Sequence, residues 1–304
     1  MDSQQHQSVL LNQAVEALSV KPDGRYLDGT FGRGGHSRLI LSVLSPTGRL
    51  VAIDCDPEAI AVANELAQAD GRLLVLAGGF EEQIERLVAT GERFDGLLFD
   101  FGVSSPQIDQ AKRGFSFQQD GPLDMRMNNG GGMTAAEWLN TAEVDDMKRV
   151  FWRYGEEKNA TRIARKIAER RVEQPLETTF DLVEVVSAVN RRDKKHPATR
   201  VFQAIRIHIN DELGQIERML PKALDLLETG GRMVVISFHS LEDRLVKRFF
   251  RSMSQPPKVD RRMPVIPADA PKPKLKLLGK PVKAADHDDN IRARSAIMRV
   301  AEKR

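Results

Sequence analysis

Short apolar runs recur along the first hundred residues, and an amphipathic segment follows each of them. The runs at residues 25–27, 50–54, 75–76 and 94–100 predict four strands, because they are short, apolar and bounded by turn-forming residues. The segments between them have a helical period. We therefore expect four strand–helix units before residue 101, which is typical of an α/β fold with a parallel sheet.

The first two amphipathic segments indicate where helices begin and which faces they bury. In the first, Leu39, Ile40 and Val43 fall on one face of a helix. The second begins at Pro57, a residue favoured at the first helical position. Both segments are expected to pack on the sheet.

Beyond Pro106 the alternation of strands and helices stops. Residues 118–133 are polar and rich in glycine, which predicts a loop. Helical patterns follow at residues 135–150, 158–171 and 181–189. The sequence therefore predicts a helical insertion in the α/β fold.

The α/β pattern resumes near residue 200. A helical face runs from Val201 to Ile216, and Pro221 is expected to restart or kink this helix. The turn Gly230-Gly231 precedes a strand at residues 233–236, and a helix is expected at residues 241–250. Residues 296–301 predict a closing edge strand. We expect a discontinuous domain of residues 1–105 and 200–304 around an inserted domain of residues 106–199.

A glycine-rich turn follows the first predicted strand. Residues 28–36 read Asp-Gly-Thr-Phe-Gly-Arg-Gly-Gly-His. Glycines let backbone N–H groups approach a ligand at a helix N-terminus. The dinucleotide fingerprint G-x-G-x-x-G would place its third glycine at Ser37, so a nicotinamide dinucleotide is a poor candidate. The remaining pattern, D-x-T-x-G-x-G, resembles the first motif of S-adenosylmethionine-dependent methyltransferases.

A second carboxylate lies about twenty residues past this turn, where doubly wound folds place the side chain that bonds a ribose hydroxyl. It is Asp54, at the end of an apolar strand. Alternatively, Asp54 and Asp56 simply cap the helix that begins at Pro57. One residue could serve both purposes.

Length and composition limit the other possibilities. The chain of 304 residues is long enough for two domains and has no apolar run that could span a bilayer. Its polar N-terminus lacks a signal-peptide core, so we expect a cytoplasmic protein with no membrane partner. The single cysteine, Cys55, excludes an internal disulfide and a multi-cysteine zinc site, and we expect no metal. It also lies beside the predicted ribose ligand, which disfavours covalent catalysis by cysteine.

Positive charge is concentrated in two segments. Residues 256–284 carry a net charge of +6 and seven of the 15 prolines, although the whole chain carries only +3. This loop either contacts nucleic-acid phosphates or is simply solvated. The second segment is the predicted helix at 158–171, where Glu169 alone opposes six basic residues; we interpret it as an RNA contact rather than an ordinary solvated face. These six are Lys158, Arg162, Arg165, Lys166, Arg170 and Arg171.

Five separated motifs then match one family in order. They read DGTFGRGGHS at residues 28–37, DFGVSSPQ at 100–107, GPLDMRM at 121–127, HPATR at 196–200 and SFHSLED at 237–243. Together they resemble the MraW/RsmH family of bacterial 16S ribosomal RNA cytosine-N4 methyltransferases. The resemblance extends from residues 9–11 to residues 292–295 and so covers nearly the whole chain.

The resemblance implies a Rossmann-like class I methyltransferase sheet that binds S-adenosylmethionine, with a smaller helical insertion for substrate recognition. It implies a target cytosine in the decoding centre (the P site) of 16S rRNA, within the small ribosomal subunit. Oligomeric state stays open. The cofactor contacts that it implies are Gly34, Gly35, His36, Asp54, Phe80, Asp100 and Gln107.

Methyl transfer to cytosine N4 needs hydrogen-bond acceptors, because the amine lone pair is delocalised into the ring. Many amino-methyltransferases carry a D/N/S-P-P-Y/F motif for this purpose, from which residues 100–106 depart. Asp100, the pair Ser104 and Ser105, or backbone carbonyls could serve, and we place Asp100 first. A role for Asp100 in cofactor binding alone is equally compatible with the sequence.

Six polar residues of the later motifs are candidates for substrate contacts, although each could equally form an ion pair or cap a helix. Three hypotheses therefore stand: an rRNA N4-methyltransferase, a methyltransferase acting on DNA or a small amine, and a non-catalytic RNA-binding module. The two basic segments disfavour a small-molecule substrate, and the intact glycine turn disfavours an inactive scaffold. The six candidates are Asp124, Arg126, Arg200, Arg206, His239 and Glu242.

Overall fold

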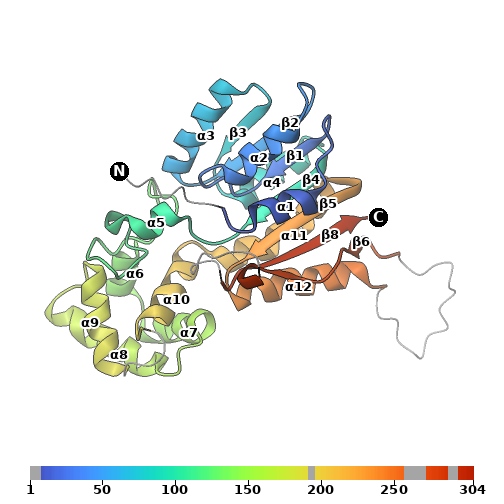
Figure 1. The fold of residues 1–304 in the computed structure, drawn as a ribbon. Coiled ribbons are helices and arrows are strands. Elements are labelled where there is room, and N and C mark those ends of the chain that lie inside the picture. The colour runs from blue at the N-terminus through green and yellow to red at the C-terminus, as the bar shows by residue number, and fades with distance from the viewer. Residues whose placement is uncertain (1–7, 191–195, 257–271, 287–293) are drawn as a thin grey trace, which may run out of the picture. The chain divides into compact units, whose positions relative to one another are not determined.

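A computed structural model describes residues 8–190, 196–256, 272–286 and 294–304 of the chain (Figure 1). The chain divides into two compact units. The first comprises residues 1–102 and 213–304, and the second comprises residues 103–212. Among the described residues, no helix is both long enough and apolar enough to span a membrane.

The first unit is built on one eight-stranded sheet with the order β3-β2-β1-β4-β5-β8-β6, in which β7 also pairs with β8. The first five strands are parallel, and β8 runs antiparallel to β5, β6 and β7. The strands are β1 (Arg25–Asp28), β2 (Arg49–Asp54), β3 (Leu73–Ala77), β4 (Phe94–Asp100), β5 (Leu227–Ser237), β6 (Leu275–Leu277), β7 (Val282–Lys283) and β8 (Ile297–Lys303).

Helices cover both faces of this sheet (Figure 1). Because strand side chains alternate between faces, Tyr26 of β1 packs in one core and Leu27 in the other. Helices α1, α2 and α3 lie over the first core, and α4, α11 and α12 lie over the second. These helices are α1 (Leu11–Leu18), α2 (Gly35–Val43), α3 (Pro57–Ala69), α4 (Phe80–Ala89), α11 (Glu212–Leu226) and α12 (Ser240–Ser254), with a short 3-10 turn at Ala284–Asp286.

The second unit is helical and has a core of its own. Phe151, Ile163 and Ile205 are fully buried at its centre. At Gly155, α7 packs closely against α10, since a Cβ there would lie 2.5 Å from the carbonyl oxygen of Arg200. Its elements are α5 (Ser105–Asp109), a 3-10 turn (Ala111–Arg113), α6 (Ala135–Thr141), α7 (Val144–Gly155), α8 (Ala160–Glu173), α9 (Thr179–Val189) and α10 (Thr199–Ile209).

The structure confirms the α/β fold with a helical insertion and corrects several element boundaries. Three strand–helix units, not four, precede β4, and α1 comes before the first of them. In α2, Ile40 is buried as expected but Val43 is 42% exposed, because the buried face turns toward Leu41. The strand β8 is not at the edge of the sheet, since β6 and β7 both pair with it.

Two expected helices are in fact interrupted. The pattern at residues 135–150 forms α6 and α7, which are separated by the extended residue Ala142. The guanidinium of Arg171 compensates this break by donating to the carbonyl oxygens of Leu139 and Ala142, both at 2.8 Å. Pro221, in contrast, lies inside a continuous helix α11.

The other break falls at residues 210–211, between α10 and α11. There the Asn210 amide replaces helical hydrogen bonds, donating to the Met125 carbonyl and accepting from the Met127 N–H. Asp211, with a φ of 46°, then redirects the chain into α11. The second unit accordingly includes α10, which the sequence-based division assigned to the discontinuous domain.

Candidate active site

The glycine-rich turn joins β1 to α2 at the carboxyl edge of the parallel strands. The Gly29 N–H donates to the Leu98 carbonyl and the Phe31 N–H to the Ile53 carbonyl, so the turn is fastened to both neighbouring strands. Gly34 caps α2 with a φ of 74°, and a Cβ there would lie 2.5 Å from the Phe31 ring. The local conformation therefore depends on glycine.

Asp28 organises this turn from inside the protein. It is fully buried and accepts hydrogen bonds from the Thr30 N–H at 3.1 Å and the Ser37 hydroxyl at 2.6 Å. Burial raises the pKa of Asp28 to about 6. Asp28 is not among the site residues predicted from the sequence, although an acid two residues before Thr30 is the spacing of an Asx turn.

Asp54 ends β2 and faces the same turn. Its two oxygens accept from the Gly32 N–H at 2.7 Å and the Asp56 N–H at 2.9 Å. Burial raises the pKa of Asp54 to about 6. Asp56, rather than Asp54, caps α3 by accepting from the Glu58 N–H at 3.0 Å. Each carboxylate oxygen of Asp54 has further lone-pair capacity for a ligand hydroxyl.

Asp100 ends β4 and is the least satisfied of these acids. Its backbone N–H donates to the Thr30 hydroxyl at 2.6 Å, which fixes the strand end. Its Oδ1 is buried and has no hydrogen-bond partner within the described parts of the chain. Burial, and then the charges of Asp28 and Glu242, hold the pKa of Asp100 well above its usual range. This carboxyl is therefore suited to accept a proton or an N–H group.

His36 lies on α2 beside Asp100. Its imidazole is 4% exposed, and its Nδ1 lies 3.9 Å from Asp100 Oδ2. Burial lowers the pKa of His36 to about 4, against a hydrogen bond to the Val9 backbone that favours the charged form. The ring is therefore neutral at pH 7. Its Nε2 has no partner among the residues that the structure describes.

The remaining expected cofactor contacts differ in what surrounds them. Phe80 is the first residue of α4, and its half-buried ring lies 5.9 Å from the Phe101 ring. At Gly35, a Cβ would collide with the Ser8 hydroxyl, so a larger residue there would have to displace the Ser8 side chain. Gln107 lies in the second unit, where its side chain and that of Ser104 form the capping box of α5.

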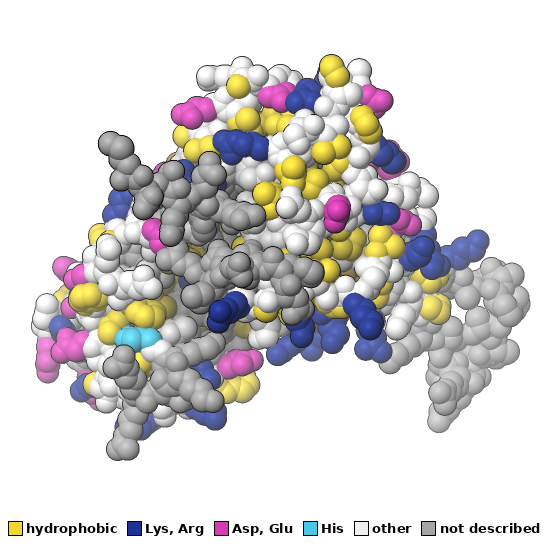
Figure 2. All heavy atoms as spheres, in the orientation of Figure 1, with side chains coloured by type: hydrophobic (Ala, Val, Ile, Leu, Met, Phe, Trp, Pro, Cys, Tyr) yellow, Lys and Arg dark blue, Asp and Glu magenta, His cyan; other side chains and the backbone are white. Residues whose placement is uncertain are grey.

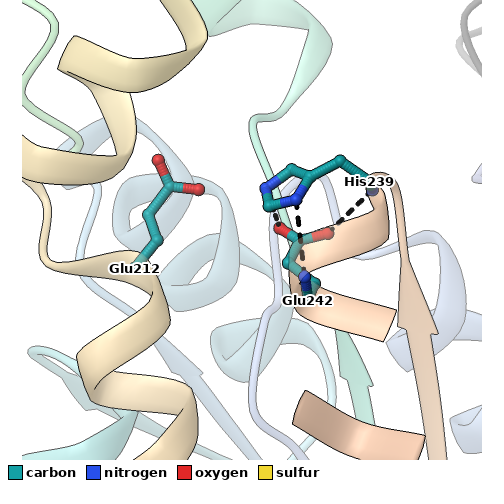
Figure 3. A group of neighbouring side chains, drawn as sticks. All are labelled: Glu212, His239 and Glu242. Carbon is teal, nitrogen blue, oxygen red and sulfur yellow. Dashed lines mark hydrogen bonds and ion pairs between the residues drawn. The ribbon is translucent and has the colours of Figure 1, made fainter. Parts of the chain in front are cut away.

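His239 and Glu242 begin α12, directly after β5 (Figure 3). Glu242 is fully buried, and its Oε2 accepts from the backbone N–H groups of Phe238 at 2.7 Å and His239 at 3.1 Å. The His239 ring completes the capping box, with Nδ1 accepting from the Glu242 N–H and Nε2 lying 3.1 Å from Glu242 Oε1. The pair thus fixes the start of α12 at the carboxyl edge of the sheet.

The candidates in the second unit form ion pairs of their own. Arg126 binds Asp124 in bidentate fashion, at 2.8 and 2.7 Å, and closes the loop at residues 118–133. Arg206 binds Glu212 in the same way, with both distances 2.8 Å. Arg200 is exposed on α10. The ion pairs therefore explain the positions of Asp124, Arg126 and Arg206, and no contact with a substrate is needed to explain them.

The two basic segments also fare differently. In α8, Arg171 is engaged structurally, Arg170 donates to Gln174, and Lys166 pairs with Glu169 at 3.3 Å. Arg162 and Arg165 stay exposed. Of the basic loop, residues 257–271 lie outside the described residues, and the remainder includes the short strands β6 and β7.

The sheet order, the glycine turn after β1 and the acids that end β1, β2 and β4 together define the class I methyltransferase fold. A sequence model of the MraW methylase family matches residues 3–304. The chain belongs to this family. It is accordingly a methyltransferase, and S-adenosylmethionine is its methyl donor.

Individual relatives agree over the whole length. The chain is 54% identical to "Ribosomal RNA small subunit methyltransferase H" of Shewanella loihica over 98% of this chain and 97% of that protein. It is also 54% identical to the protein of the same name from Dechloromonas aromatica, over 98% of both. Among solved structures, an rRNA methylase from Streptococcus thermophilus matches with a TM-score of 0.41 and 11% identity, over 98% of each chain.

The residues present fit this methyl donor. The buried Asp100 Oδ1 and His36 Nε2 have no partner in the described part of the protein, and both lie beside the glycine turn. Unsatisfied buried polar atoms are costly, so a ligand with polar groups would relieve them. The acidic surroundings of Asp100 also suit a cationic sulfonium.

Proposed function

We propose that this protein methylates the exocyclic N4 of a cytosine in the decoding centre of 16S rRNA, at the P site of the small ribosomal subunit. The relatives that match over the full chain carry names that specify small-subunit ribosomal RNA. The choice of N4 and of the decoding centre rests on the five ordered motifs described above. The corresponding location is the cytoplasm, where ribosomal subunits are found.

In this proposal the first unit holds the cofactor at its carboxyl edge. Gly34, Gly35 and His36 line the turn, Asp54 takes the ribose hydroxyls, and Phe80 offers an apolar face to the adenine. Gln107 and Asp100 complete the set that we assign. When bound, S-adenosylmethionine supplies an electrophilic methyl group on a positively charged sulfur.

Asp100 is the residue that we propose as the acceptor of the N4 hydrogen bond and proton. Its buried Oδ1 lacks a partner in the described residues, and its pKa is held well above the usual range. An acceptor at this strand end localises the N4 lone pair by taking an N–H hydrogen bond, and it can receive the proton that the methylated amine must lose. Positioned acid–base groups of this kind contribute about 10²–10⁴-fold to rate.

The expected substrate residues fall into two groups. His239 and Glu242 begin α12 at the same edge as Asp100, and Glu242 raises the pKa of Asp100. We assign this pair to shaping the base pocket. Asp124, Arg126, Arg200 and Arg206 belong to the second unit, and we assign them to the RNA around the target. The three that already form ion pairs would act by holding loop and helix geometry.

The target base must leave its stack before N4 can reach the methyl group, which costs a few kcal/mol. A structured but accessible site on an assembled subunit meets this need better than a short oligonucleotide. We therefore propose the small subunit itself as the substrate.

The experiment that tests this function is methyl transfer from labelled S-adenosylmethionine to small subunits prepared from cells that lack the protein. Digested nucleosides are then identified by mass spectrometry. We expect N4-methylcytidine at one decoding-centre position. Label on another atom would contradict the N4 assignment but not the fold. Cofactor binding without transfer would contradict the rRNA assignment and favour the alternatives: DNA, a small amine, or a non-catalytic RNA-binding role.

A further inference from the structure

The outer face of α12 carries a stripe of one charge sign. Its exposed basic residues recur at the spacing that brings side chains onto one helical face. Figure 2 shows the Lys and Arg side chains gathered over this helix. We call these residues the basic face of α12: Arg244, Lys247, Arg248 and Arg251.

The opposite side of the helix explains why this face is held outward. Val246 and Phe250 are buried in the core beneath the sheet, where Leu275 of β6 joins them. The two acids of the helix lie in its first turn, at residues 242–243. Asp243 is bound bidentately by Arg299, at 2.6 and 3.0 Å, and Glu242 is fully buried. Neither acid lies among the exposed residues of the stripe.

The two cations of α11, which covers the same core, are paired, in contrast to three of those on α12. On α11, Arg218 binds Glu81 at 2.7 Å and Lys222 binds Glu85 at 3.0 Å. Among the described residues, Lys247, Arg248 and Arg251 form no ion pair. Like charges at these spacings repel one another, so these three cations cost stability unless an anionic partner binds them.

We propose that the basic face of α12 docks the phosphate backbone of a helical arm of small-subunit rRNA, away from the target base. The proposal rests on the proposed rRNA substrate and adds a contact on the methyltransferase unit itself. The stripe spans about 10 Å along the helix, over which duplex DNA carries about six phosphate charges. Because α12 begins at His239 and Glu242, the docked RNA would be coupled rigidly to the carboxyl edge of the sheet.

The test uses the double charge reversal Lys247→Glu/Arg248→Glu in the full-length protein. Its matched control is Arg86→Glu/Arg93→Glu, which changes the same charge at two exposed arginines of the same unit. Methyl transfer to small subunits is measured from 50 to 200 mM salt, and cofactor affinity is measured by calorimetry. The variant Lys247→Arg/Arg248→Lys checks that charge alone matters.

We expect the α12 reversal to raise KM for subunits about tenfold while kcat and cofactor affinity stay unchanged. The slope of log affinity against log salt should fall by about 1.5–2, which corresponds to two lost phosphate contacts. The charge-conserving variant should behave like the wild type. Salt screens exposed charges that lie away from the docked phosphates, so the control reversal should change KM less than threefold.

An unchanged KM and salt slope in the α12 reversal, with active wild-type protein, would overturn the docking proposal and leave the rRNA function intact. Absence of transfer by the wild type would instead contradict the rRNA function. Equal losses in the α12 and control variants would show a nonspecific charge effect and overturn the proposal. Binding to anionic lipid vesicles is measured for the same variants. If the α12 reversal bound small subunits normally but no longer bound the vesicles, the face would belong to a membrane contact and the proposal would be overturned.

Discussion

Two charged regions of the first unit differ in sign and in their exposure to solvent. The acids at the carboxyl edge, Asp28, Asp54, Asp100 and Glu242, are largely removed from water, and burial raises the pKa values of the first three. The basic face of α12 lies in solvent. Buried charges interact strongly with their neighbours and respond mainly to pH, whereas the interactions of exposed charges are screened by salt.

The difference indicates that two parts of the helix α12 serve two different binding roles. The start of α12 contributes Glu242 to the acidic edge, and its outer face carries the basic stripe. The edge is suited to a single small cationic ligand and one reactive amine. The stripe is suited to a polyanion of no fixed sequence. Variants at the two regions should therefore affect different measurable quantities.

The largest effect is expected from Asp100→Asn. The amide keeps the size of the carboxyl group but cannot accept a proton, so kcat should fall by about 10³-fold. The same change removes a carboxyl whose ionisation burial opposes, so the cofactor-free protein should melt at a higher temperature at pH 7.5. Turnover on small subunits and thermal unfolding measure the two effects. Activity within fivefold of wild type would exclude Asp100 as the proton acceptor.

Asp54→Asn should primarily affect the cofactor. A hydrogen bond to a charged group contributes about 1.5–3 kcal/mol, so the dissociation constant for S-adenosylmethionine should rise by about 10- to 100-fold. Calorimetry on the folded variant measures it, with circular dichroism as the check on folding. Because Asp54 also accepts from the Gly32 and Asp56 N–H groups, Asp54→Ala should be the weaker binder of the two. Unchanged affinity in both variants would remove Asp54 from the ribose.

The acids at the carboxyl edge show which features of the site could be predicted from the sequence and which could not. An acid ending an apolar strand is visible in the sequence, so Asp54 and Asp100 could be placed at the edge, and the strand pattern yielded the α/β fold. The hydrogen bond from Ser37 to Asp28 and the pairing of Arg206 with Glu212 depend on how the chain turns between the two residues, which the strand and helix pattern does not specify. The sequence does not reveal the breaks at Ala142 and at residues 210–211, because their hydrogen bonds involve distant residues. Arg171 supplies those of the first break, and Met125 and Met127 are the partners of Asn210 at the second.

A smaller effect is expected in the pH dependence of stability. Asp28 has a pKa of about 6 when folded and near 3.8 when unfolded, so the folded state holds its proton more tightly. As pH rises from about 4 to about 6, the unfolded chain ionises first and this group's contribution to stability falls, then levels off. Asp28→Asn lacks this term. Its unfolding free energy relative to wild type should rise over that pH range by about 1–3 kcal/mol, and a constant difference would contradict the raised pKa.

The smallest effect sharpens the contrast between α12 and the other basic helix, α8. On α8, part of the positive charge already makes contacts within the protein, because Arg171 donates to two carbonyl oxygens and Lys166 pairs with Glu169. Reversal at its two exposed arginines, Arg162→Glu/Arg165→Glu, should therefore raise KM for subunits only about threefold and reduce the salt slope by less than the α12 reversal.

Arg171→Ala provides the internal comparison for α8. It should leave the salt slope unchanged and lower the unfolding free energy by about 1–3 kcal/mol, since the carbonyl oxygens at the α6–α7 break lose their donor. Denaturant unfolding and subunit titration separate the two effects. If Arg171→Ala reduced the salt slope as much as the reversal at Arg162 and Arg165, Arg171 would be an RNA contact after all. In that case the six basic residues of the predicted helix at 158–171 would indicate the interface better than the ion pairs of α8 do.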